Sequence, residues 1–146
     1  MLKLLPHQFK KIGAIIAPLG FFLWISMQVG WISELCYFIG IKDPKPINIA
    51  TAVIGFFSFL LGTYALTFSK EKVEDELIKS IRLESFQFSA LLQIVFLILG
   101  LILIGVIPPG EGGLTLFFIV AIFIFWITYI IRFNYIIYIG IYKNEK

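Results

Sequence analysis

The chain has 146 residues, of which 60% are hydrophobic and 14% are charged, and its mean hydropathy of +0.97 excludes an ordinary soluble domain. The net charge is +3, but the cations flank apolar runs, so they indicate the orientation of a membrane protein rather than direct nucleic-acid binding. The single cysteine, Cys36, excludes an internal disulfide and any metal site built from several cysteines.

Four apolar runs are long enough to cross a bilayer as helices, because about 20 residues span the hydrocarbon core. They cover residues 12–32, 47–68, 86–107 and 114–132. Between the first two runs, Ser33 is placed to cap a short interfacial helix that ends at Gly40. The sequence therefore predicts an all-α fold, an integral membrane four-helix bundle in which residues 1–146 form a single transmembrane domain.

Small residues recur along the second span at alternating separations of four and three, which places them on one helical face. In lipid, such residues let two helix backbones approach closely, and the first span carries a shorter series of the same kind. We therefore expect these two spans to pack together; the alternative is that this face receives another protein. The predicted helix-packing residues are Gly13, Ala17, Gly20, Thr51, Gly55, Ser58, Gly62 and Ala65.

Residues 69–93 hold much of the charge of the chain, and they contain neither glycine nor proline. Ser69 can cap a helix over residues 70–84, in which Val73, Leu77 and Ile81 recur every four residues. We predict that this short amphipathic helix lies along the inner membrane surface and bends into the third span near residues 80–85. The alternative geometry is that the second span projects inward and turns later.

This amphipathic helix has five acids and four bases, and so near-neutral a balance favours contact with protein over contact with anionic lipid. The partner is either the tyrosine-rich C-terminal segment or another subunit. The alternative is that these charges only solvate a turn and enforce topology. The predicted partner-contact residues are Val73, Glu74, Asp75, Glu76, Leu77, Ile81 and Arg82.

Two further features concern the spans themselves. Gln93 shares a face of the third span with Ser89 and Gly100, so we expect it to hydrogen-bond a neighbouring helix, and a pore lined by glutamine is the alternative. Arg132 follows Leu114 by 18 residues, about 27 Å of helix, which is close to the thickness of the hydrocarbon core. Arg132 is therefore expected at the inner interface.

The distribution of Lys and Arg predicts the orientation of the spans. These residues concentrate in the N-terminal segment, the central charged stretch and the C-terminal segment, whereas the other two connectors hold only Lys42 and Lys45. By the positive-inside rule, both termini and the amphipathic helix are expected to be cytoplasmic.

The residue types of a catalytic site do not come together in this sequence. His7 is the only histidine, the predicted spans contain no Asp, Glu or Lys, and there is no glycine loop of the kind that binds phosphate. We therefore expect no enzymatic activity, no cofactor, and no catalytic, cofactor-binding or metal-binding residues.

A short motif begins with Glu74-Asp75-Glu76 and continues through Ile81-Arg82, Ser85 and Gln87. It resembles the EDExIxxIRxxSxQ pattern of a family of small multi-span bacterial membrane proteins of uncharacterised function. The match covers about 15 residues, and Phe86 and Phe88 depart from the Leu or Trp of that pattern. The resemblance implies a bacterial inner-membrane protein with a role beside a small helix-turn-helix regulator, and it supplies no active-site residue.

The leading hypothesis from the sequence is a non-catalytic accessory or scaffold subunit of a larger bacterial inner-membrane complex. It would dock through the small-residue helix face and the charged cytoplasmic helix. Its expected partners are other membrane protein subunits or further copies of itself, together with the lipid bilayer. The alternatives are a membrane sensor that relays to a cytoplasmic regulator, and a small oligomeric transporter or channel.

Overall fold

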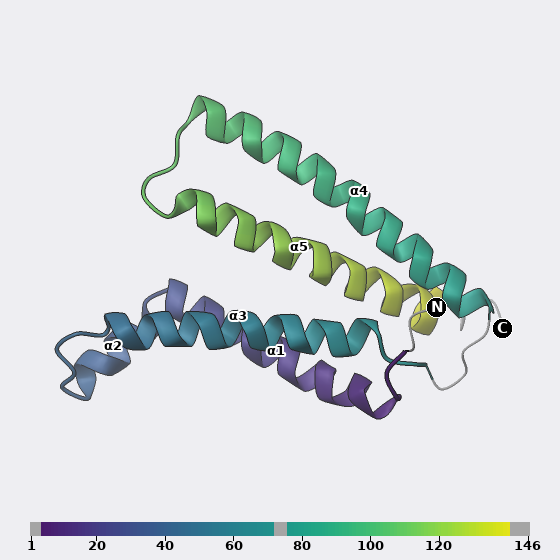
Figure 1. Ribbon diagram of the computed structural model, residues 1–146, viewed down its shortest axis with the longest axis horizontal. Helices are drawn as coiled ribbons and strands as arrows, with labels where there is room; N and C mark the ends of the chain where they lie inside the picture. Colours follow the sequence, from purple (N-terminus) through teal and green to yellow (C-terminus); the bar gives the residue numbers. More distant parts are fainter. Residues whose placement is uncertain (1–3, 72–75, 141–146) are drawn as a thin grey trace. The chain divides into compact units, whose positions relative to one another are not determined.

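The computed structural model describes residues 4–71 and 76–140, and the regular elements in these ranges are all helices (Figure 1). The predicted all-α class is thus confirmed. Four of these helices are long and apolar enough to cross a membrane, as the hydropathy predicts. The chain divides into two compact units, Met1–Val73 and Glu74–Lys146, which are described separately below. A single four-helix bundle stays a prediction.

The first unit contains α1 (Gln8–Gln28), α2 (Trp31–Phe38) and α3 (Lys45–Thr67), and α1 lies along α3 in Figure 1. The first long helix ends four residues earlier than predicted because Gly30 adopts φ +90°, a conformation that breaks the helix. The predicted short helix is present as α2, but Gly30 precedes it instead of a serine cap. The Oγ atom of Ser33 instead accepts a hydrogen bond of 2.8 Å from Nδ2 of Asn48.

The chain leaves α3 in an extended conformation, which corrects the predicted start of the amphipathic helix. The backbone N–H of Leu5 donates to the carbonyl of Phe68 at 2.7 Å, and the N–H of Lys70 donates to the carbonyl of Leu5 at 2.9 Å. These bonds form an isolated parallel β-bridge between Leu5 and Ser69. The backbone at Ser69 to Glu71 is therefore not helical, and the bridge to Leu5 holds this segment in the extended conformation at the point where the predicted helix would begin.

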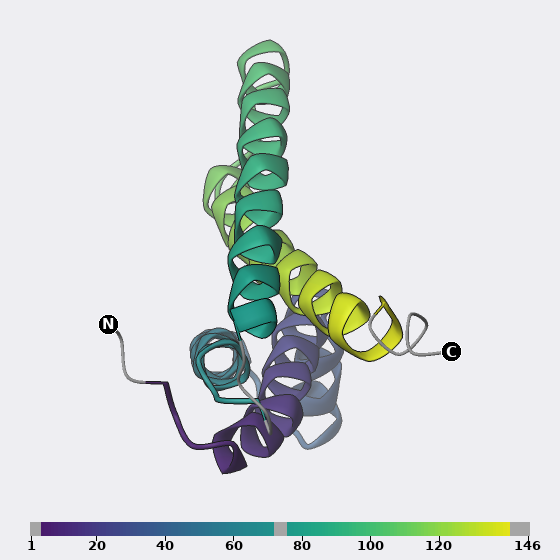
Figure 2. The same cartoon turned by 90° about the vertical axis from the view of Figure 1, so that its right-hand side faces the viewer.

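The second unit contains α4 (Glu76–Val106), α5 (Gly113–Tyr135) and a short π-helix, η1 (Ile136–Gly140). The 31 residues of α4 span about 46 Å of helix. Figure 1 and Figure 2 show that this helix is unbroken. The predicted separate helix with a bend near residues 80–85 is therefore wrong for the described residues. Ile81, Ser85 and Ser89, spaced by four, keep one continuous buried stripe on α4, and a bend would interrupt it.

The core of the second unit lies at the end where α4 begins and α5 ends. Ile81, Tyr129 and Phe133 are its buried members, and the rings of Tyr129 and Phe133 are stacked with centroids 5.8 Å apart. Phe86 meets Tyr129 edge to face at 6.3 Å. Partly buried hydrophobic residues complete the cluster: Ile78, Trp126, Ile130, Ile136 and Ile137.

Candidate functional site

The predicted helix-packing residues are brought together within the first unit. Gly13, Ala17 and Gly20 of α1 and Gly55 and Gly62 of α3 are all buried. The two backbones are so close that a Cβ atom at Gly62 would lie 2.7 Å from Cα of Ala17. A Cβ atom at Gly20 would likewise lie 2.7 Å from the carbonyl oxygen of Gly55.

The remaining members of this set, Thr51, Ser58 and Ala65, are half-buried on α3. A Cβ atom at Gly13 would lie 3.1 Å from Cβ of Ala65, so Ala65 also faces α1. At Gly55, Gly62 and Ala65 the small-residue face of α3 is thus covered by α1. A helix from another protein could not approach α3 closely at these positions.

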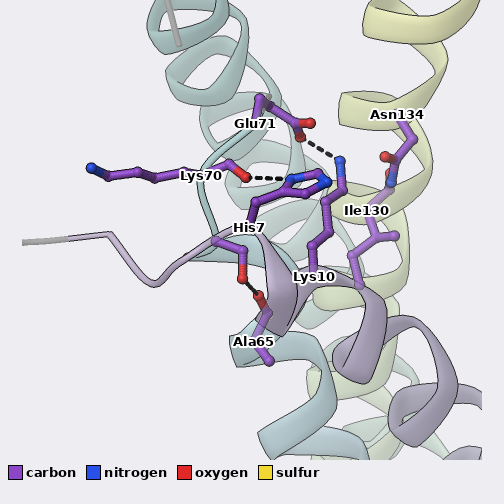
Figure 3. A network of polar contacts seen from close by, with 8 residues as sticks. His7, Lys10, Ala65, Lys70, Glu71, Ile130 and Asn134 are labelled. Carbon is purple, nitrogen blue, oxygen red and sulfur yellow. Dashed lines mark hydrogen bonds and ion pairs between the residues drawn. The ribbon is translucent and has the colours of Figure 1, made fainter. Parts of the chain in front are cut away.

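A polar cluster connects the N-terminal segment to the chain that follows α3 (Figure 3). Nδ1 of His7 lies 3.0 Å from the carbonyl oxygen of Lys70, a bond that places the imidazole proton on Nδ1. The ammonium group of Lys10 donates to a carboxylate oxygen of Glu71. The side chains of Lys10 and Glu71 are only 12% and 7% exposed, so this ion pair is nearly buried.

Ser69 adjoins the same cluster, and its hydroxyl group has a role other than the predicted cap. Its Oγ atom donates to the carbonyl oxygen of Ala65, in the last turn of α3. The side chain is almost fully buried, so the hydroxyl helps to end one helix rather than to start another. Helix C-termini carry carbonyl groups without intrahelical partners, and such a donor satisfies one of them.

The predicted partner-contact residues have different environments. Val73, Glu74 and Asp75 lie outside the described residues. Glu76 and Leu77 are exposed at the start of α4. The other two members are at least partly covered: Ile81 is buried against Tyr129 and Phe133, and the guanidinium of Arg82 lies over the Phe133 ring at 5.3 Å from its centroid.

An ion pair joins α4 to α5 just beyond this segment. Nη2 of Arg132 lies 2.6 Å from a carboxylate oxygen of Glu84. The same guanidinium lies over the ring of Phe88, 4.1 Å from its centroid. The glutamate side chain is 64% exposed, so water screens this pair far more than it screens the pair of Lys10 with Glu71.

Sequence reasoning missed both ion pairs, although it placed all four residues on the cytoplasmic side. Lys10 and Glu71 are 61 positions apart, and Glu84 and Arg132 are 48 apart. The only available signal was the opposite charge of residues expected at the same membrane surface. It could indicate that pairs form there, but not which acid meets which base.

Two predictions about polar chemistry can be compared with the structure. Within residues 4–71 and 76–140, Oε1 of Gln93 is shielded from solvent and has no hydrogen-bond partner, so this atom makes no bond to a neighbouring helix there. In the same ranges, no three His, Cys, Asp or Glu side chains lie close enough together to hold a metal ion. Cys36 is a free, buried thiol.

Comparisons of the chain with protein-family models, with curated proteins and with solved structures each give no match.

Proposed function

We propose that this chain is a non-catalytic accessory or scaffold subunit of a larger bacterial inner-membrane complex, and that it docks onto a partner through the first turns of α4. Four membrane-length helices support a multi-pass membrane protein. The observation that supports docking concerns the part of α4 that precedes Glu84 and its ion pair with Arg132. This part is helical without a break, and it exposes apolar side chains.

The length of α4 supports this role. Glu76 precedes Glu84 by eight residues, about 12 Å of helix. Because Arg132 stands at the expected inner interface and pairs with Glu84, this segment would project beyond the hydrocarbon core. Leu77 and Leu83 are both more than half exposed on it. Outside lipid, these two leucines offer apolar surface that a protein partner could cover.

The leading hypothesis from the sequence uses the small-residue face to dock onto a partner, but in this proposal that face packs within the chain. Gly55 and Gly62 already contact α1, so they serve the fold of the first unit. Ile81 serves the core of the second unit. The docking surface is therefore reduced to the exposed side of α4, with Glu76, Leu77 and Leu83 as its described members.

The proposed orientation places both termini and the start of α4 in the cytoplasm, as the positive-inside rule predicts. Cysteine labelling in a Cys36→Ser background tests it. A membrane-impermeant thiol reagent should label Lys42→Cys from outside intact cells, and it should label Lys79→Cys only after the membrane is opened. The reverse pattern would overturn the orientation and, with it, the cytoplasmic docking site.

Purification in mild detergent, followed by mass spectrometry of the co-eluting proteins, tests the subunit role. We expect one or more membrane proteins to co-elute in constant ratio with the chain. Recovery of the chain alone at monomer mass would sink the proposal. Co-elution of a soluble helix-turn-helix regulator instead would favour the sensor function.

The docking surface itself is tested with matched leucine substitutions. Leu77→Ala and Leu83→Ala should reduce co-elution of the partner, because each removes an exposed apolar side chain from the projecting part of α4. Leu103→Ala removes a leucine of similar exposure from the span and should leave co-elution unchanged. If all three variants behave alike, the partner does not bind at the start of α4.

A further inference from the structure

The helix α2 presents an apolar face on the side that points away from α3. Trp31, Glu34, Leu35 and Phe38 follow the i, i+3, i+4, i+7 spacing of one helical face. Ser33 and Cys36 lie on the opposite face, where Ser33 bonds Asn48 of α3 and Cys36 is buried. The four residues line a shallow hollow of about 540 Å³.

The apolar side chains on this face are more exposed than is usual for a surface in contact with water. Phe38 is 91% exposed, and Trp31 and Leu35 are each at least half exposed. The helix is nevertheless held against α3, since Ser33 accepts a hydrogen bond from Asn48 and Cys36 is buried on the same face. A contiguous apolar surface that is held in place and exposed in this way indicates contact with a membrane or with another protein.

The contact between Trp31 and α1 shows which environment lies on this side. The Trp31 ring packs against Phe22, with centroids 6.2 Å apart. Phe22 is itself exposed on the lateral surface of α1, well before the helix ends at Gln28. The apolar face of α2 is therefore continuous with the side of a membrane-length helix, not with its end.

We infer that α2 lies in the membrane interface with Trp31, Leu35 and Phe38 inserted among phospholipids. Tryptophan is typical of this depth, where its ring is apolar and its N–H can reach water or headgroups. Glu34 on the same face limits the insertion, because its carboxylate must stay at the level of the headgroups.

The charges near α2 indicate the class of lipid. Glu34 and Asp43 balance Lys42 and Lys45, so this side of the unit carries no excess of cations for an anionic headgroup. Insertion is thus driven by apolar contact, and a zwitterionic bilayer suffices. The inference depends on α1 and α3 crossing the membrane, as in the proposed function, but not on the docking role of α4.

Spin labels tested in vesicles of phosphatidylcholine can measure the depth of α2. In a Cys36→Ser background, Phe38→Cys is labelled and compared with Phe57→Cys on the exposed side of α3 and with Lys42→Cys in the connector. Collision with oxygen, which concentrates in lipid, should increase from Lys42 to Phe38 to Phe57. Collision with a water-soluble nickel chelate should follow the opposite order, and added phosphatidylglycerol should change neither order.

Each other result overturns a defined part of the inference. If the label at Phe38 behaves like the label at Lys42, α2 lies in water. If it is inaccessible to both reagents, protein covers this face instead of lipid. If it reaches the lipid only with phosphatidylglycerol present, the lipid class is wrong. If the label at Phe57 does not reach lipid, the membrane insertion of α3 fails first, and the proposed function fails with it.

A second measurement requires no cysteine variant. Brominated lipids quench tryptophan fluorescence at short range, and the difference between the unmodified chain and a Trp31→Phe variant isolates the signal of Trp31. Bromine near the top of the acyl chains should quench this signal more strongly than bromine near the chain ends. Equal, negligible quenching by both lipids would place Trp31 outside the bilayer.

Discussion

In the first unit, α1 and α3 meet through glycines, with backbone against backbone, whereas in the second unit α4 and α5 meet through aromatic rings. In the most apolar stretch of each helix, 33% of the residues of α1 and 28% of the residues of α3 are buried. The corresponding share is 6% for α4 and 17% for α5. The first helix pair therefore buries a larger share of its residues than the second pair, and α4 leaves nearly all of its surface to lipid or to a partner.

The ion pairs of the two units differ in the same sense. Lys10 and Glu71 are nearly enclosed and join segments that are far apart in the sequence. Glu84 is mostly exposed, and its partner Arg132 also contacts the ring of Phe88. Loss of one partner from a buried pair is costly, because the remaining charge stays buried without its counter-charge, whereas an exposed pair contributes little to stability. This contrast explains why docking is proposed at α4 and not at the first unit.

Gly62→Leu should have the largest effect, because no side chain fits between the two backbones. A Cβ atom alone would lie 2.7 Å from Cα of Ala17, and backbone atoms cannot move aside without separating the helices. We expect a loss of about 3 kcal/mol or more in the free energy of unfolding. Unfolding in SDS, followed by tryptophan fluorescence, measures this loss.

Two glycines of α4 supply the controls for Gly62. A Cβ atom at Gly105 would meet nothing within 4 Å, so Gly105→Leu should be nearly neutral. A Cβ atom at Gly100 would lie 2.5 Å from Cζ of Phe117, the end of a ring that can rotate, so Gly100→Ala should have an intermediate cost. Equal losses at all three positions would contradict the difference between a backbone contact and a ring contact.

Lys10→Met should have the next largest effect. It leaves the carboxylate of Glu71 nearly buried without its ammonium partner, at a cost of about 3 kcal/mol. The double variant Lys10→Met, Glu71→Leu should cost much less than the sum of the two single variants, because no charge is then left behind. Additive losses in the same SDS unfolding assay would show that the two side chains do not interact.

The helices themselves could largely be predicted from the sequence, since length and hydropathy suffice to identify four membrane-length segments. The residues at which the helices begin and end were harder to predict. Gly30 ends α1 through its positive φ, yet a lone glycine within an apolar run predicts no break. The extended conformation at Ser69 depends on hydrogen bonds to Leu5, and no local pattern around Ser69 indicates a partner 64 positions away.

The environment of the charged stretch could be predicted only in part, because it also depends on residues that are distant in the sequence. Helical periodicity places Leu77 and Ile81 on one face, but it does not say which of them a neighbouring helix covers. Tyr129 and Phe133 of α5 cover Ile81, while Leu77 stays exposed. The division depends on how α4 and α5 cross, and that crossing follows from aromatic packing over many residues.

Ile81→Ala separates these two roles on α4. Because Ile81 is buried in the cluster with Tyr129 and Phe133, its truncation should lower the free energy of unfolding by about 2 kcal/mol. Leu77→Ala, one turn earlier and exposed, should change stability by less than about 0.5 kcal/mol. If Leu77→Ala lowered the free energy of unfolding more than Ile81→Ala, then α4 would pack on α5 through Leu77 and not through Ile81.

Glu84→Gln should have the smallest effect, and it completes the comparison of the two ion pairs. The glutamate is 64% exposed, so the pair with Arg132 should contribute at most about 1 kcal/mol, and less at high salt. The charge of Arg132 also retains its contact with the ring of Phe88, so the substitution leaves no isolated cation. A loss that equals that of Lys10→Met, and that salt does not change, would mean that water does not reach Glu84. The start of α4 would then be enclosed by protein, and the exposed surface on which docking is proposed would not exist.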